Sequence, residues 1–175
     1  FDVTSLMENL DKSQLKFIYN PSIGFAEMYL NDENIEKAIR TLEVSNFVSQ
    51  VAAISEVRKK LVTIQKEMGK NKGVVMDGRD IGTVVFTDAE IKIFMTSSAE
   101  TRAKRRFDEL IEKGQEVSYD DVYTNVVARD RVDTTRKDSP LVKADEAIEI
   151  DNSNLTKEEQ FAIILKLVEE KLRDV

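Results

Sequence analysis

The stretch Val74-Val75-Met76-Asp77-Gly78-Arg79-Asp80 joins a short apolar run to a polar turn. Short runs that are apolar throughout are typical of strands buried on both faces of a parallel sheet. In such sheets, ligands bind just past the carboxyl ends of the strands. The arginine and the two carboxylates of the turn therefore lie where we expect a binding site.

Two further strands are predicted downstream, and a helix follows each of them. The strands cover residues 91–95 and 147–151. The helices begin with capping boxes, Ser97-x-x-Glu100 and Thr156-x-x-Glu159, and a third helical stretch covers 119–131. Strands that alternate with helices predict an α/β fold built on a parallel sheet.

The first third of the chain predicts a small β unit followed by helices. Residues 16–19 and 25–30 are β-prone runs separated by the turn Asn20-Pro21-Ser22, and 33–35 is a third short strand. From Thr41 onward, apolar residues repeat at helical spacing. We divide the chain into residues 1–72, an antiparallel β insert with two helices, and 73–175, the α/β core, within one structural unit.

The composition excludes several kinds of chemistry. The 175 residues include no cysteine and no histidine, which removes thiolate nucleophiles, Cys-ligated zinc and the commonest general base. The remaining polar side chains suit phosphoryl transfer, because positioning and charge neutralisation do most of its catalytic work. The net charge of −7 argues against a nucleic-acid partner. No apolar run could span a membrane and no secretory leader is visible, so we expect a cytoplasmic protein without a membrane partner.

Two groups of arginines are further candidates for binding an anionic ligand. Arg102 and Arg106 lie one turn apart on one face of a predicted helix. In the second group, fixed positive charges would neutralise a transferring phosphoryl group. It consists of Arg129, Arg131, Asp133 and Arg136, with Lys137 beside them. Both groups, like the turn above, also fit a solvated surface with local ion pairs. Spacing alone leaves these alternatives open.

Taken together, these segments resemble the bacterial cytidylate kinases over nearly the whole chain and in the same order. The most specific match is Met76-Asp77-Gly78-Arg79-Asp80-Ile81-Gly82-Thr83. The other matching segments are 39–45, 48–53, 57–58, 91–94, 102–106, 129–136, 139–141, 144–145 and 150–151. The resemblance implies a P-loop-type nucleoside monophosphate kinase fold, with a parallel sheet flanked by helices and a small β-rich insert. It makes residues 1–72 the monophosphate-binding region and implies a short lid around 107–120.

The resemblance also implies an activity, which is the transfer of a phosphoryl group from ATP, with Mg²⁺, to CMP or dCMP in pyrimidine nucleotide metabolism. Ser49, Arg58 and Asp80 would then read the cytosine edge. A carboxylate facing the cytosine amino group would reject uracil, because the uracil carbonyl at that position would place two acceptors opposite each other. We expect these nucleotides to be the partners of a monomeric protein.

The remaining roles follow from the same resemblance. Arg129 and Asp133 would hold the sugar of CMP, and Arg79 and Arg136 would bind the phosphate, which makes all three arginines the predicted catalytic residues. At the other end of the site, the resemblance places Arg102 and Arg106 beside ATP. It also implies that Asp77 contacts the magnesium ion through a water molecule.

The sequence departs from this family in one respect. The family begins with a strand, a Gly-x-x-x-x-Gly-Lys-Ser/Thr loop and a helix, followed by Ser-Gly-Ala-x-Tyr-Arg, and the sequence contains neither motif. Because that loop cradles ATP, we expect that the N-terminal strand-loop-helix is missing and that this chain alone is inactive. Neighbours of a missing central strand would expose apolar faces and unpaired edges.

Three alternatives stay open beside this interpretation. The first is a related kinase that acts on UMP or AMP. The second is a non-catalytic nucleotide-binding or assembly module that has lost the ATP loop, and the third is an α/β domain without a ligand.

Overall fold

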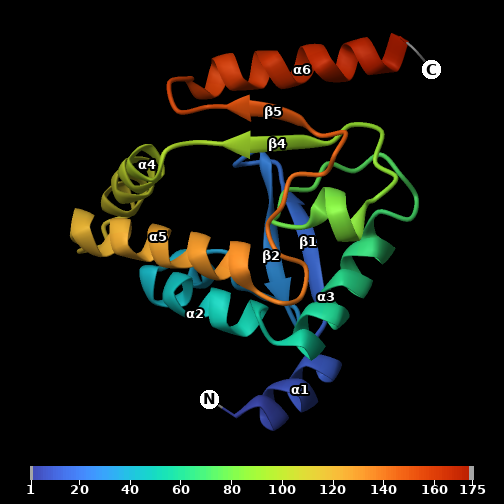
Figure 1. Ribbon diagram of the computed structural model, residues 1–175. Coiled ribbons are helices and arrows are strands. Elements are labelled where there is room, and N and C mark those ends of the chain that lie inside the picture. Colours follow the sequence, from blue (N-terminus) through green and yellow to red (C-terminus); the bar gives the residue numbers. More distant parts are fainter. Residues whose placement is uncertain (1, 174–175) are drawn as a thin grey trace. The chain divides into compact units, whose positions relative to one another are not determined.

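The computed structural model describes residues 2–173 and shows a mixed α/β fold (Figure 1). The chain divides into two compact units, residues 2–60 and 61–173, and each is described by itself. None of the helices in the described residues is both long and apolar enough to cross a lipid bilayer. The division into residues 1–72 and 73–175 stays a prediction.

The antiparallel insert predicted in the first unit is confirmed. Its sheet has the order β1-β2-β3, with β1 (Leu15–Asn20), β2 (Phe25–Leu30) and β3 (Glu33–Asn34). Asn20 pairs with Phe25 across a tight turn, in which Gly24 adopts a φ of +77° that an L-residue rarely accepts. The turn signal in the sequence therefore set the register of the hairpin.

Helices surround this insert in the sequence. The first, α1 (Val3–Lys12), was not predicted, although Asp2 is a visible cap whose Oδ1 accepts a hydrogen bond from the Thr4 N–H at 2.9 Å. The short η1 (Ala38–Arg40) leads to α2 (Leu42–Ala52), which begins just after Thr41, where the sequence predicts that the helical pattern starts; the Thr41 hydroxyl caps it, a role that was not predicted. Next, α3 (Ser55–Met68) begins in this unit and continues into the second.

The second unit holds a two-stranded parallel sheet and three helices. β4 (Ile93–Thr96) pairs with β5 (Ile148–Asp151), close to the predicted strands. The helices are α4 (Ala99–Glu112), α5 (Tyr119–Thr135) and α6 (Lys157–Arg173). α4 and α5 pack side by side, as Figure 1 shows, and bury Ala103, Leu110 and Val122. This packing brings Arg102 of α4 within hydrogen-bonding distance of Asp130 of α5.

The strand predicted at Val74-Val75-Met76 is wrong, because these residues form no strand in the structure. Among residues 61–173 the sheet pairs β4 with β5 alone, and Val75 is fully exposed. A strand is defined by hydrogen bonds to a neighbour, which an apolar run cannot supply by itself. The run therefore pairs with no strand among the described residues.

The two predicted capping boxes have different outcomes. The box at Thr156 is confirmed, since the Thr156 and Glu159 side chains each bond the other's N–H. The box at Ser97 is wrong by one residue. Ser98 is the cap of α4, because its N–H is held by Ser153 Oγ at 3.1 Å and its hydroxyl accepts from the Thr101 N–H at 3.1 Å.

A π-helical turn, η2 (Ile81–Val85), follows the polar turn and was not predicted. Such turns are rare, and those that do occur often lie at functional sites. The Phe86 ring packs against Gly69, where an added Cβ would lie 2.3 Å from two ring carbons. This close approach fixes the segment that carries Arg79 and Asp80 against the end of α3.

Candidate functional site

Asp133, in the last turn of α5, is the centre of the candidate site. Its Oδ2 accepts a hydrogen bond from Arg79 Nε at 3.0 Å, and its Oδ1 accepts one from Arg136 Nη1 at 3.1 Å. One carboxylate thus connects the polar turn before η2 with the end of α5. The structure brings together three of the predicted residues from segments 54 positions apart in the sequence.

Arg136 is held at several points. Its backbone N–H donates to the Val132 carbonyl at 3.0 Å and ends α5, while its Nε donates to the Ser139 carbonyl at 2.8 Å. The side chains of Asp133 and Arg136 are only 5% and 3% exposed. A charge pair this deeply buried requires good geometry and additional hydrogen bonds, and both are present here.

Arg129 lies one turn before Asp133 in a positive environment. Burial lowers the pKa of its guanidinium, and the nearby positive charges of Arg79 and Arg106 lower it further, against the opposing effects of Asp133 and Asp130. Arg129 and Arg106 are half-buried and Arg79 is exposed, and several cations this close together favour an anionic ligand that offsets their repulsion. This is the environment expected of a phosphate site.

Arg102 forms a bidentate pair with Asp130 in the middle of α5. Its Nη1 and Nη2 donate to the two carboxylate oxygens at 2.8 and 2.6 Å, and its Nε donates to the Ser97 carbonyl at 3.2 Å. The hydrogen bonds to Asp130 raise the pKa of Arg102. Asp130 was missed as a site residue, although its position three residues before Asp133 places both on one helical face.

Arg106 follows Arg102 by one turn on α4. Its Nη1 donates to Glu109 Oε2 at 2.9 Å, and Lys113 Nζ donates to the other oxygen of Glu109. Burial raises the pKa of Glu109, but the hydrogen bonds from Lys113 and Arg106 outweigh it, so the net pKa is lowered. The two predicted ATP arginines therefore lie on the helix that packs against α5.

The two aspartates of the polar turn differ in exposure. Asp80 is 6% exposed, and its carbonyl accepts from the Val84 and Val85 N–H groups to open η2. Asp77 is exposed. In residues 2–173 no three carboxylates, histidines or cysteines gather closely enough to hold a metal ion by themselves. The water-mediated magnesium contact of Asp77 stays a prediction.

Ser49 and Arg58 lie in the unit of residues 2–60. Ser49, on α2, is 7% exposed, and its hydroxyl has no hydrogen-bond partner in the part of the chain that the structure describes. Buried hydroxyls are normally satisfied, so a ligand atom is a natural partner for this one. Arg58 Nε donates to the Ala52 carbonyl at 2.9 Å and so satisfies the end of α2, a structural role that the sequence did not predict.

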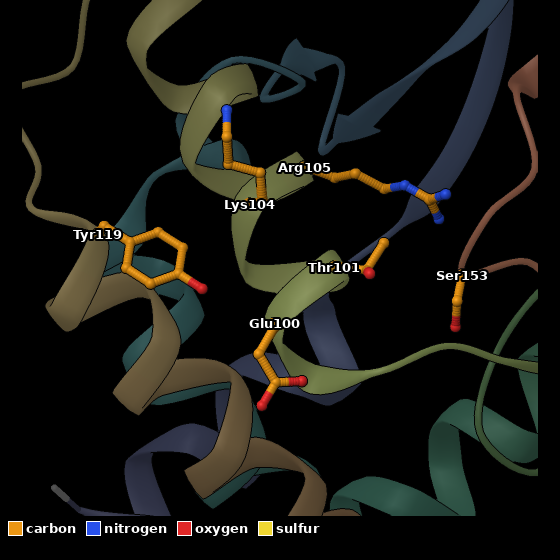
Figure 2. Close-up of a pocket in the computed structure, with 6 residues that line it drawn as sticks. All are labelled: Glu100, Thr101, Lys104, Arg105, Tyr119 and Ser153. Atoms are coloured by element: carbon orange, nitrogen blue, oxygen red, sulfur yellow. The ribbon is translucent and has the colours of Figure 1, made fainter.

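An open depression of about 480 Å³ lies elsewhere on the second unit (Figure 2). It is lined by Glu100, Thr101, Lys104, Arg105, Tyr119 and Ser153, none of which was predicted as a site residue. Arg105 donates to the Asn152 and Leu155 carbonyls, and Lys104 pairs with Asp108. Because these cations already have partners, the depression adds little to the candidate site.

Comparison with known proteins gives consistent matches. The family model described as cytidylate kinase matches residues 1–170. The cytidylate kinase of Flavobacterium johnsoniae is 67% identical over 173 residues, which cover 99% of this chain and 75% of that protein. The cytidylate kinase of Phocaeicola vulgatus is 54% identical over 159 residues, 91% of this chain and 69% of that protein. That of Cytophaga hutchinsonii is 46% identical over 168 residues, 96% of this chain and 72% of that protein.

Proposed function

This chain belongs to the cytidylate kinase family, and on that premise we propose that the protein transfers the γ-phosphoryl group of ATP to CMP or dCMP. The family assignment makes the protein a kinase, and it confirms the resemblance read from the sequence. In the proposed reaction a phosphate oxygen of CMP attacks the γ-phosphorus in line and ADP leaves, without a covalent intermediate. We infer that the reaction serves pyrimidine nucleotide metabolism.

The observation that carries this proposal is the Asp133 cluster with its arginines. Asp133 fixes Arg79 and Arg136 through two hydrogen bonds, and Arg129 lies nearby in the same positive field. In our proposal Arg79 and Arg136 bind either the accepting phosphate of CMP or the phosphoryl group that is transferred. Arginines held in place before the reaction neutralise the developing charge without reorganising, which is why such groups contribute strongly to phosphoryl transfer.

The nucleoside of CMP is assigned to a second set of residues. We propose that Ser49, Arg58 and Asp80 read the cytosine edge, and that Arg129 and Asp133 hold the sugar. The buried, unpartnered hydroxyl of Ser49 and the burial of Asp80 support base reading. A carboxylate that accepts from the cytosine amino group selects against uracil, because uracil presents a carbonyl there. Indifference to one sugar hydroxyl would admit dCMP.

The donor end of the site is assigned to Arg102, Arg106 and Asp77. We propose that the two arginines contact ATP, at the base of the lid around 107–120. The exposed carboxylate of Asp77 fits an outer contact to a hydrated Mg²⁺, which keeps several of its waters in such sites. When bound, the metal neutralises charge on the phosphates.

The sequence lacks the glycine-rich ATP loop of the family, which limits the activity that we expect of these 175 residues alone. The 175 residues contain no Gly-x-x-x-x-Gly-Lys-Ser/Thr sequence, which in this fold supplies backbone amides, a lysine and a magnesium-binding hydroxyl to ATP. We therefore propose that the 175-residue chain by itself has no useful turnover. We also propose that these 175 residues do not include the strand-loop-helix with which the family begins. For the complete protein we propose a monomeric state.

The test is phosphoryl transfer from Mg-ATP to CMP, dCMP, UMP and AMP, with the longest chain that the gene encodes. We expect a strong preference for CMP and dCMP. Equal or better transfer to UMP or AMP would replace the cytosine assignment, and no transfer from a folded chain would mean that the scaffold serves binding only. Turnover by the 175-residue chain in a parallel assay would refute the proposal of inactivity.

A further inference from the structure

Ser139 adopts a backbone conformation that its sequence context disfavours. Its φ is +50°, in the left-handed region that L-residues rarely enter. It also precedes Pro140, and a residue before proline normally takes an extended conformation. Such a conformation persists only where surrounding contacts hold it, and residues of this kind cluster at functional sites.

The contacts around Ser139 tie the loop after α5 to the last turn of that helix. The Ser139 carbonyl accepts a hydrogen bond from Arg136 Nε at 2.8 Å. Two residues further on, the Leu141 N–H donates to the Asp133 carbonyl at 2.7 Å. The chain thus folds back onto the two residues at the centre of the site, and the left-handed residue makes the reversal.

These bonds determine how the Arg136 guanidinium is oriented. Nε is directed to the Ser139 carbonyl and Nη1 to Asp133 Oδ1, so two donors of one planar group are fixed on different partners. A planar fork bonded at two points has little freedom to rotate. The direction in which the rest of the guanidinium presents its N–H bonds is therefore set by the loop as well as by Asp133.

We propose that Ser139 is a positioning residue for phosphoryl transfer, which acts by aiming its carbonyl at Arg136 Nε. The inference rests on the proposed function only in that Arg136 acts on the phosphoryl group. Ser139 contributes through its backbone conformation rather than through its hydroxyl. Its substitution should therefore matter according to how well the new residue accepts a positive φ.

The test compares Ser139→Gly with Ser139→Val in the longest chain that the gene encodes. Glycine accepts the left-handed region and should retain most of the turnover. Valine is β-branched and should displace the carbonyl, lowering kcat by about 10- to 100-fold with the KM for ATP nearly unchanged. In an Arg136→Lys background, which has no Nε–H, the valine should cause little further loss, because the two changes act through one contact.

A second readout observes the contact itself. The Arg136 Nε–H resonance in ¹⁵N NMR spectra can be assigned by its loss in Arg136→Lys. In Ser139→Gly it should keep its chemical shift and its slow exchange with solvent. In Ser139→Val its chemical shift should change and its exchange should become faster. The proposal is overturned if folded Ser139→Val keeps its kcat, if its loss is equally large in the lysine background, or if the resonance does not respond. Because this signal needs no turnover, an enzyme that fails to phosphorylate CMP would refute the proposed function separately.

Discussion

The end and the middle of α5 show the same chemistry in two environments. Asp133 and Asp130 lie three residues apart, and each holds one arginine from another part of the second unit. At the end, the Asp133 and Arg136 side chains are 5% and 3% exposed, whereas Asp130 and Arg102 are each 37% exposed. Loss of a partner leaves a buried charge at the end of the helix, but a charge that water can reach in its middle. The contribution of an ion pair therefore depends on the solvent around it more than on its geometry.

The largest effect is expected on turnover when the buried arginine is removed. Arg136→Ala in the longest encoded chain should lower kcat by about 10³-fold or more, the range known for arginines in phosphoryl transfer. The KM for ATP should change little, because Arg136 is assigned to the transferring phosphate. Steady-state kinetics with CMP and Mg-ATP measure both quantities. Arg131→Ala, an exposed arginine on the same helix, is the control, and unchanged turnover in Arg136→Ala would remove its catalytic role.

The next effect is expected on folding when the buried carboxylate is removed. Asp133→Ala leaves the Arg136 guanidinium buried without its carboxylate, so we expect the free energy of unfolding to fall by about 3–5 kcal/mol. Urea denaturation followed by circular dichroism measures this change. The double variant Asp133→Leu with Arg136→Met should lose less stability than the single variant, because the buried pair leaves no uncompensated charge and Arg79, the other partner of Asp133, is 43% exposed. A single variant that loses under about 1 kcal/mol would contradict the burial argument.

A smaller effect is expected when the half-exposed carboxylate is removed. Asp130→Ala should lower the free energy of unfolding by about 0–1 kcal/mol, because Arg102 can turn to water. The difference should shrink in 1 M salt, where the screening length is about 3 Å. The measurement is the same urea titration at low and high salt, with Asp133→Ala alongside. If both variants lose the same free energy of unfolding at both salt concentrations, the difference between the end and the middle of α5 is not one of solvent.

Local signals in the sequence predicted much of the fold. The β1–β2 hairpin, the start of a helix near Thr41 and the Thr156–Glu159 box each depend on residues close together in the chain, and all three are confirmed. The run Val74-Val75-Met76 failed because a strand also needs a neighbour, which no local pattern specifies. Ser97 failed because a distant residue, Ser153, selected Ser98 as the cap.

The candidate site was less accessible to sequence reasoning. Spacing identified Arg79, Asp133 and Arg136 only as candidates, and their roles came from the family resemblance. Their meeting depends on packing between segments 54 residues apart. The contribution of Ser139 is a carbonyl, a group that every residue carries, so no sequence pattern identifies it. Its positive φ is visible only in the structure.

The smallest effect is expected at Glu109 on α4, a third carboxylate that holds an arginine. Lys113 and Arg106 lower its pKa in the folded chain even though burial opposes them. A lowered folded pKa means that its stabilisation is fully present above the unfolded pKa and is lost as pH falls through the folded value. Glu109 is 42% exposed, so the contribution should be only about 0.3–0.5 kcal/mol. Thermal unfolding of the unsubstituted chain and Glu109→Gln should therefore differ at neutral pH and converge between about pH 5 and 3. A difference that widens on acidification would reverse the sign of this argument and place Glu109 outside the comparison with Asp130 and Asp133.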